Sequence, residues 1–181
     1  MKELGSAMAN PTSIDMCKVK RCIRYLIGAP RCIVPFRYQR HVGNIVAWSD
    51  SDFAGCTKSR KSTSGGVILF GGCVIKSYSS TQSVRALSSG EAEYYALVKA
   101  ACGAMGIRAL MGDLGVHCES IQINTDASAA MGVAQRLGIG KIRHIEVNQL
   151  LLQEKVYCGE VKLVKVKTED NLADALPSRE E

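Results

Sequence analysis

Four acidic residues fall at the ends of expected strands or on apolar helix faces, where a purely structural role is awkward: Asp50, Glu93, Asp126 and Asp174. Carboxylate oxygens suit Mg²⁺, which binds few protein carboxylates and keeps waters and substrate phosphate oxygens as its other ligands. Two such ions about 4 Å apart are a recurring device for hydrolysing phosphodiesters. The four residues therefore predict a divalent-metal site for phosphodiester hydrolysis.

Two aspartates compete for the first position in the stretch AWSDSDFAG. Asp50 closes an apolar strand expected over 45–49, and functional groups gather at the carboxyl ends of strands in open α/β sheets. Asp52 follows two residues later and shares the side of Asp50 only if the extended conformation continues. The strand end favours Asp50, but the local pattern alone leaves Asp52 open.

Two glutamates compete near the start of a helix expected over 88–114. Ser88 and Glu91 have the spacing of a capping box, in which each side chain accepts a backbone N–H at the start of the helix. Glu91 therefore has a structural role. Glu93 shares its helix face with small apolar residues such as Ala96 and Ala100, and a carboxylate is costly to bury there without a cation or hydrogen bonds. Glu93 is the functional candidate.

The other two acids are less clear by themselves. Asp126 closes a strand expected over 120–125 and opens the next helix, so a helix N-cap and a metal ligand are both open. Asp174 lies among apolar neighbours in NLADAL, as Glu93 does in its helix. No histidine or Ser/His/Asp set lies near these motifs in sequence to offer a competing chemistry.

The elements that must position these residues alternate along the chain. We expect helices over 12–28, 88–114, 127–137, 142–157 and 168–176, and strands over 45–49, 66–70, 73–78, 120–125 and 161–166. The second helix has glycines at 103 and 106 that favour a break, and Gly71-Gly72 predicts a tight hairpin. Three strands followed by alternating helices and strands predict an α/β fold with one mixed sheet.

The positive charge lies in one part of the chain. Residues 1–40 hold eight Lys/Arg and two acids, whereas residues 41–181 hold fifteen of each sign, so the whole net charge of +6 belongs to the first segment. We expect a boundary near residue 40, between a basic amphipathic helix with its linker (1–40) and an α/β domain (41–181). The basic segment has two interpretations: it contacts a polyanion, or it is simply a solvated helix face.

The sequence gives few signs of export or membrane insertion. No run approaches the roughly 18 apolar residues of a membrane span, and the N-terminus lacks a secretory signal pattern. The eight cysteines are scattered without a CxxC pair, which is typical of reduced thiols. We therefore expect an intracellular protein, cytoplasmic or nuclear, with no membrane partner.

Several ordered motifs resemble the ribonuclease H region of copia-type long-terminal-repeat retrotransposon Pol polyproteins. SDSDFAG with RKSTSGG resembles SDADWAG with RKSTSG, and ALSSGEAEYYAL resembles ALSSTEAEYxAL. NTDASAAM and KTEDNLADAL stand where the family has CDNxSAI and PTxDQxADxxTK. Near the N-terminus, NPT and RYLIGA resemble the end of the family's reverse transcriptase part. The resemblance covers nearly the whole chain.

The resemblance implies a ribonuclease H-like fold, a five-stranded mixed sheet whose first three strands are antiparallel, flanked by helices. It implies a metal site of Asp50, Glu93, Asp126 and Asp174 holding two Mg²⁺ (or Mn²⁺) ions, and so selects Asp50 over Asp52. The implied activity is endonucleolytic cleavage of the RNA strand of RNA–DNA hybrids. Residues 1–40 would then be a remnant of the connection to a reverse transcriptase domain, which becomes a candidate partner.

A polar, basic loop downstream of Asp50 is the candidate contact to the hybrid, because recognition of a hybrid needs phosphate and 2′-hydroxyl contacts. Its residues are Lys58, Arg60, Lys61, Ser62, Thr63 and Ser64. A solvated turn before the hairpin is the competing interpretation.

Some residues depart from the family pattern. Glu146 replaces an aspartate after His144, the tail LPSREE replaces LTK, and VKVKTED offers no counterpart to the loop histidine of cellular ribonucleases H. The alternative function is a catalytically inactive ribonuclease H-fold module that binds nucleic acid or acts as a scaffold. A different nuclease of this fold, such as an integrase or resolvase, fits the order of the acids less well.

Overall fold

The computed structural model describes residues 4–5, 7–31, 33–39, 43–56, 59–138 and 150–174. The chain forms two compact units, Met1–Phe36 and Arg37–Glu181. The origin of the first segment as a remnant of a polymerase connection stays a prediction. No helix in the described ranges is long and apolar enough to cross a membrane.

The first unit carries helix α2, Ser13–Gly28. Its N-cap is Thr12: the Thr12 hydroxyl accepts from the N–H of Asp15 at 3.3 Å, and the Thr12 N–H donates to the Asp15 carboxylate at 2.9 Å. This reciprocal pair is a capping box. None of the residues of α2 is buried, so the helix displays both its basic and its apolar side chains.

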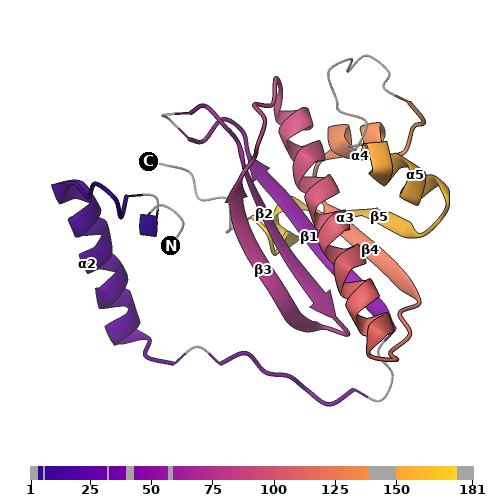
Figure 1. The fold of residues 1–181 in the computed structure, drawn as a ribbon, viewed down its shortest axis with the longest axis horizontal. Helices are drawn as coiled ribbons and strands as arrows, with labels where there is room; N and C mark the ends of the chain where they lie inside the picture. Colours follow the sequence, from indigo (N-terminus) through magenta and orange to yellow (C-terminus); the bar gives the residue numbers. More distant parts are fainter. Residues whose placement is uncertain are drawn as a thin grey trace. The chain divides into compact units, whose positions relative to one another are not determined.

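The second unit is built on a five-stranded sheet, shown in Figure 1. Its strands are β1 (Asn44–Asp52), β2 (Thr63–Phe70), β3 (Cys73–Thr81), β4 (Ser120–Thr125) and β5 (Val161–Lys165). They lie in the order β3-β2-β1-β4-β5. Strands β1, β2 and β3 pair antiparallel, whereas β4 is parallel to both β1 and β5. The expected mixed sheet with three leading antiparallel strands is confirmed.

The β2–β3 hairpin depends on glycine at two kinds of position. Gly71 and Gly72 both have positive φ, 54° and 81°, as a two-residue hairpin turn requires. Further along the hairpin, Gly66 pairs with Tyr78, and a Cβ at residue 66 would lie 2.4 Å from the Cζ atom of that ring. The missing side chain at residue 66 therefore makes room for the aromatic ring on the neighbouring strand.

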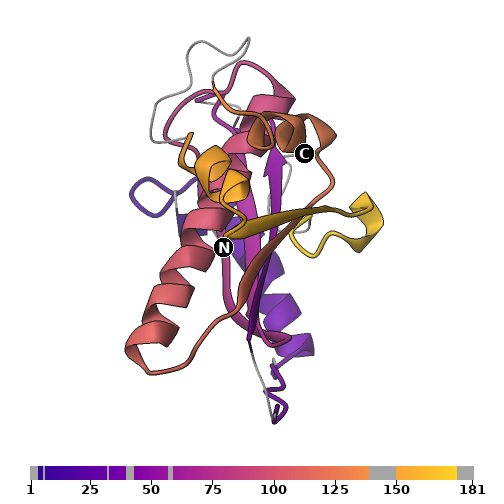
Figure 2. The same ribbon diagram turned by 90° about the vertical axis from the view of Figure 1, so that its right-hand side faces the viewer.

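Helix α3, Ser89–Asp113, covers one face of the sheet (Figures 1 and 2). The expected break near Gly103 or Gly106 is wrong, because α3 is continuous. Gly103 instead lets the helix approach β2: a Cβ there would lie 2.8 Å from Cδ1 of Ile68. The core between α3 and the sheet is built from small and branched apolar side chains, including Ile45, Leu97 and Ala100.

The remaining helices are short. Helix α4 (Ser128–Ala134) and helix α5 (Leu151–Tyr157) both pack against α3. The helix expected over 142–157 is described only from its α5 part, because residues 139–149 lie outside the described ranges.

The last helix expected, over 168–176, is wrong in its described part. The 3₁₀ turn η2, Thr168–Asp170, is followed by Asn171 in an extended conformation. The side-chain oxygen of Asn171 accepts the N–H of Ala173 at 3.1 Å, a local hydrogen bond that competes with helix continuation.

Candidate active site

Strand register brings Asp50 and Asp126 to the same end of the sheet, where β1 and β4 reach their carboxyl ends. Strands β1 and β4 run parallel, with Trp48 opposite Asn124. Two residues further along each strand, the chain reaches Asp50 and Asp126. The two carboxylates therefore stand at the carboxyl ends of neighbouring parallel strands, the position where open α/β sheets place functional groups.

Helix α3 carries the third carboxylate to this end of the sheet. Glu93 lies in the second turn from the helix start and is half-buried. Burial is the main cause that raises the pKa of Glu93, and the charges of Asp126 and Asp50 raise it further. Like charges raise the pKa of a carboxyl only when they are near, so Glu93 faces the two strand-end aspartates.

The C-terminal segment brings the fourth. Val166 N–H donates to the Thr125 carbonyl at 3.0 Å, and the Thr168 hydroxyl donates to Oδ2 of Asp126 at 2.8 Å. The buried side chain of Asn171 then donates to the carbonyl oxygen of Ser49 at 3.2 Å. These contacts hold the segment across the ends of β1 and β4, three residues before Asp174.

Asp50 lies at the electrostatic centre of the group. Burial raises its pKa most, a hydrogen bond from the Ser51 backbone opposes this, and the charges of Asp126, Asp174 and Asp52 raise it further. The net direction is upward, as expected for carboxylates that share a site without a compensating cation. The structure therefore brings all four sequence-predicted acids together, and their role as metal ligands stays a prediction.

The carboxylates converge without forming a closed coordination shell. Among the described residues, no group of three or more His, Cys, Asp or Glu side chains is arranged to hold a metal ion. The donor set nevertheless has the chemistry that a hard divalent cation prefers, four carboxylates with unfavourable mutual repulsion. A bound cation would relieve the repulsion between these carboxylates, which contributes to the raised pKa values of Asp50 and Glu93.

Asp52 belongs to the turn that ends β1. A Cβ at Gly55 would lie 1.6 Å from Oδ2 of Asp52, so this carboxylate occupies the space over that glycine. The same turn holds Ala54 at a positive φ of 54°, and the Ala54 N–H donates to the buried Ser62 hydroxyl at 3.1 Å. The side chain of Asp52 thus packs within its own turn, although its charge still acts on Asp50.

Glu91 is structural, but its hydrogen bonds differ from those of a capping box. Ser88 Oγ accepts the Glu91 N–H at 3.2 Å, as expected. The Glu91 carboxylate accepts from the N–H of Leu87 at 2.9 Å and from the hydroxyl of Tyr95 at 2.5 Å, not from Ser88. With only 2% of its surface exposed, Glu91 fixes the start of α3 and so the direction in which Glu93 points.

The expected substrate loop divides into an exposed part and a buried part. Arg60 is exposed, Lys61 donates from Nζ to the Ser83 carbonyl at 2.5 Å, and Lys58 lies outside the described residues. Ser62, Thr63 and Ser64 are buried. The hydroxyls of Ser62 and Ser64 accept internal hydrogen bonds from Ala54 N–H and Gln82 Nε2. The hydroxyls of Ser62 and Ser64 therefore support the loop from inside, and the role of the six loop residues in substrate binding stays a prediction.

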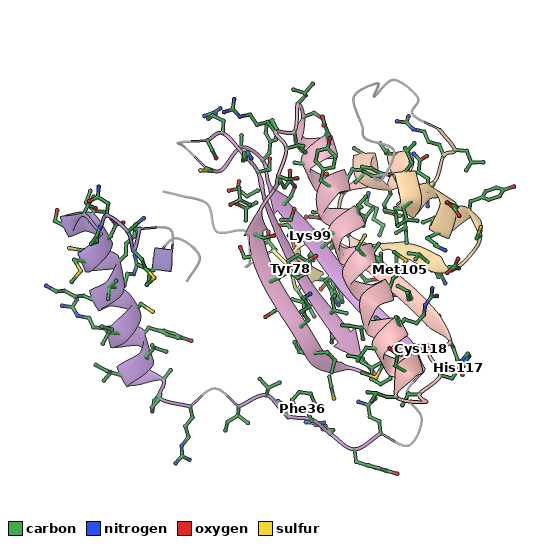
Figure 3. The ribbon with its side chains drawn as sticks, in the orientation of Figure 1. Phe36, Tyr78, Lys99, Met105, His117 and Cys118 are labelled. Carbon is green, nitrogen blue, oxygen red and sulfur yellow. The ribbon has the colours of Figure 1, made fainter. Side chains whose placement is uncertain are left out.

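Sequence reasoning missed Thr168 and Asn171, the two side chains that fasten the C-terminal segment. Asn171 follows the polar run Thr168–Asp170 and did not stand out in the sequence, and nothing linked it to Ser49, 122 residues earlier. Of the histidines, His41 and His144 lie outside the described residues, and His117 lies beside Cys118 near the opposite end of α3 from Glu93 (Figure 3).

Comparison with solved structures defines the class of fold. The N-terminal RNase H domain of rv2228c from Mycobacterium tuberculosis matches with a TM-score of 0.50, covering 75% of this chain and 91% of that chain at 16% identity. The second unit therefore has the ribonuclease H fold.

Sequence comparison finds relatives among retrovirus-related Pol polyproteins. The chain is 28% identical over 170 residues to the retrovirus-related Pol polyprotein from transposon TNT 1-94 of Nicotiana tabacum, and 27% identical over 184 residues to that from transposon RE1 of Arabidopsis thaliana. These alignments cover 93% and 97% of this chain but only 13% and 12% of the polyproteins. No family model matches. The chain is therefore similar to a short segment, about an eighth of the length, of retrovirus-related Pol polyproteins from copia-type transposons, as its motifs predicted.

Proposed function

We propose that this chain is a metal-dependent endonuclease that hydrolyses the RNA strand of RNA–DNA hybrids. The observation that carries the proposal is the convergence of four carboxylates at the carboxyl ends of β1 and β4 in a ribonuclease H fold. They belong to Asp50, Glu93, Asp126 and Asp174. They come from two strands, one helix and the C-terminal segment, so only the folded chain unites them. The kinship with Pol polyproteins supports the same function and makes a reverse transcriptase domain the proposed partner inside the cell.

The proposed cofactor is a pair of Mg²⁺ or Mn²⁺ ions held by the four carboxylates. Such ions supply an activated water and stabilise the leaving 3′ oxygen. The part of this chain is to hold its ligands in place: the strands fix Asp50 and Asp126, and helix α3 fixes Glu93. The hydroxyl of Thr168 orients the carboxylate of Asp126 through its 2.8 Å hydrogen bond, as outer hydrogen bonds orient metal-binding carboxylates.

Substrate contacts are proposed for the exposed basic residues of the loop after β1. Arg60 and Lys61, with Lys58, would neutralise phosphates of the hybrid, while the buried hydroxyls of Ser62 and Ser64 hold the loop in shape. Discrimination against DNA duplexes would come from contacts to 2′-hydroxyls, which only RNA carries.

The decisive experiment compares Asp50→Asn with Asp52→Asn in cleavage of a labelled hybrid. With Mg²⁺ or Mn²⁺, Asp50→Asn should lose activity by on the order of 10²-fold or more, because it removes a ligand charge. Asp52→Asn should keep most of the activity. RNA–RNA and DNA–DNA duplexes of the same sequence serve as substrate controls. An intact hybrid after incubation with the wild-type protein and either metal at low salt would disprove the enzymatic proposal.

The second candidate is a catalytically inactive module of the same fold that binds nucleic acid. It is favoured by the observation that, among the described residues, no three acidic side chains are arranged around a metal position. This candidate predicts hybrid binding without cleavage and no thermal shift on addition of Mg²⁺ or Mn²⁺. The enzyme predicts both cleavage and a thermal shift.

A further inference from the structure

A cavity lies between the end of edge strand β3 and helix α3, away from the carboxylates. Its volume is about 330 Å³. Its lining is mixed: apolar surface exceeds polar surface, and the residues with polar side chains are Ser64, Thr81, Gln82, Ser83, Tyr95 and Lys99. Tyr95 and Lys99 lie on the side of α3 away from Glu93, since two and six residues correspond to about 200° and 240° of helical rotation. The cavity is therefore separate from the carboxylate group.

Two lysines flank one aromatic ring beside this cavity. Lys99 Nζ lies 5.5 Å from the centroid of the Tyr78 ring, and Lys76 Nζ lies 6.0 Å from it. Figure 3 shows Tyr78 and Lys99 together between β3 and α3. Lys99 also donates to the hydroxyl of Ser80. Burial, and then the charge of Lys76, lower the pKa of Lys99, so the two ammonium groups act on each other.

These cations have only neutral partners in the described structure. Lys99 contacts a hydroxyl and a ring, and Lys61 donates to the Ser83 carbonyl at the cavity wall. The carboxylate of Glu160 pairs with other cations, Arg108 and Lys155. The positive charge beside the cavity is therefore not balanced by a carboxylate of the described chain.

The sequence around the cavity carries charge of one sign. Residues 53–90 contain five Lys/Arg (Lys58, Arg60, Lys61, Lys76 and Arg85) and no Asp or Glu. The next acid, Glu91, is 2% exposed, and its carboxylate already accepts from Leu87 and Tyr95. A surface with unbalanced ammonium groups and many hydroxyls is suited to an anion with several acceptor oxygens.

The cavity lies at the end of the sheet that carries the candidate active site. Asp52 pairs with Thr63 on β2, and Thr63 pairs with Thr81 on β3. Thr81, which lines the cavity, therefore lies two strands from the end of β1 at the same level. A nucleic-acid strand that passes the four carboxylates and the loop at Lys61 can continue to this cavity.

We infer that the cavity and its lysine rim, Lys76 and Lys99, bind backbone phosphates of a nucleic-acid strand. The spread of the cations over three elements favours a polymer over a single ion: Lys76 and Lys99 flank Tyr78 from β3 and α3, and Lys61 reaches the Ser83 carbonyl at the cavity wall from the loop after β1. Successive phosphates of one strand can meet these separate cations. The inference rests on the proposed function for the identity of the polymer, and extends its contact surface beyond the loop after β1.

The first test measures binding without cleavage. A fluorescent RNA–DNA hybrid is titrated with the full chain in EDTA at several salt concentrations, using the double variant Lys76→Gln/Lys99→Gln. Lys162→Gln/Lys165→Gln is the matched control, because both of these lysines are exposed on β5 at the other edge of the sheet. The test variant should raise Kd about tenfold and reduce the slope of log K against log salt by about 2, close to 0.9 per phosphate contact. The control should change neither.

Equal Kd values and equal salt slopes for the two double variants would overturn the inference. Its failure can be told apart from failure of the proposed function. If the wild-type protein does not cleave the hybrid but the Lys76/Lys99 variant still binds it more weakly, the phosphate-binding inference is supported and the enzymatic proposal is wrong. If the wild-type protein cleaves the hybrid and the two double variants bind alike, the enzymatic proposal is supported and the phosphate-binding inference is wrong.

A second measurement uses the wild-type protein and needs no variant. Cys102 lines the cavity and is exposed, while Cys158 is exposed elsewhere. Bound hybrid should slow alkylation of Cys102 by iodoacetamide, read by peptide mass spectrometry, and leave Cys158 unchanged. Inorganic phosphate and poly-glutamate, matched in charge concentration, should not protect Cys102. Equal protection by either anion would overturn the assignment to a nucleic-acid strand.

Discussion

The side-chain amide of Asn171 donates a 3.2 Å hydrogen bond to the carbonyl oxygen of Ser49, the residue directly before Asp50. Both partners are buried, with 6% and 1% of their surfaces exposed. The same side chain accepts the N–H of Ala173 through its oxygen. One amide therefore joins the strand that carries the first aspartate to the turn that carries the last.

Asn171→Ala should lower the free energy of unfolding by about 2 kcal/mol, because it leaves the buried Ser49 carbonyl without its donor. It should also reduce cleavage, since Asp174 loses its attachment to β1. Urea denaturation followed by circular dichroism measures the first effect. Asp170→Ala, at an exposed neighbouring position, is the control and should stay near wild-type stability. Equal stability of the two variants would show that the amide does not hold this segment.

Asp50→Asn should make the metal-free protein more stable at pH 7. The pKa of Asp50 is raised in the folded chain above its ordinary value of 3.8, so the folded state holds this proton more tightly than the unfolded state. The free energy of unfolding then falls as the pH rises from the ordinary pKa through the folded pKa, and the whole cost is present at pH 7. The variant removes that cost.

Thermal denaturation in EDTA measures this effect. The Tm of Asp50→Asn should exceed that of wild type at pH 7, and the difference should shrink below about pH 3, where the carboxyl is protonated in both states. Added Mg²⁺ should raise the Tm of wild type through binding to the native state and raise that of the variant less. A variant with a lower Tm than wild type in EDTA at pH 7 would contradict the electrostatic account.

Glu91 and Glu93 should respond to substitution in opposite ways. Glu91→Ala removes a buried carboxylate that accepts from Leu87 and Tyr95, and should lower the free energy of unfolding by about 2 kcal/mol or more. Glu93→Gln should keep or raise stability, because burial and two nearby aspartates already disfavour its charge, and should abolish cleavage. Chemical denaturation and the hybrid cleavage assay together separate the two roles. Loss of stability in Glu93→Gln would assign that residue to the fold as well.

Gly66→Ala should destabilise the sheet. The added methyl would lie 2.4 Å from the Tyr78 ring, and overpacking of this kind typically costs about 1–3 kcal/mol. Gly132→Ala in α4 is the control, since nothing lies within 4 Å of its added methyl and alanine favours the helix by about 1 kcal/mol. Thermal denaturation should give a lower Tm for the first variant and an equal or higher Tm for the second.

Local patterns predicted most of the fold, and tertiary pairing accounts for the differences. β4 matches the strand expected over 120–125, where isoleucines alternate with polar residues. β1 was expected to end at residue 49, yet it continues to Asp52 because that polar end pairs with β2. Gly103 suggested a broken helix because its packing partner, Ile68, is distant in sequence.

The candidate site was predictable as a set of residue types but not as an arrangement. Each acid could be chosen from its own neighbourhood or from the family motifs, whereas the contacts of Thr168 and Asn171 depend on where the C-terminal segment crosses the sheet. The burial of Ser62 and Ser64 could not be predicted, because a buried polar strand start has the same sequence pattern as a solvated loop. Only the folded structure shows that the Ser62 hydroxyl accepts from Ala54 N–H and the Ser64 hydroxyl accepts from Gln82 Nε2.

The division of roles between Glu91 and Glu93 has an evolutionary consequence. Glu91 supports the fold through its hydrogen bonds to Leu87 and Tyr95, whereas burial disfavours the charge of Glu93, which under the proposed function serves catalysis alone. A copy of this sequence that is retained for another purpose, under selection for solubility alone, should keep Glu91 and lose Glu93 early. The codons for residues 91 and 93, separated by one, would thus record whether a lineage of such copies is still selected for catalysis.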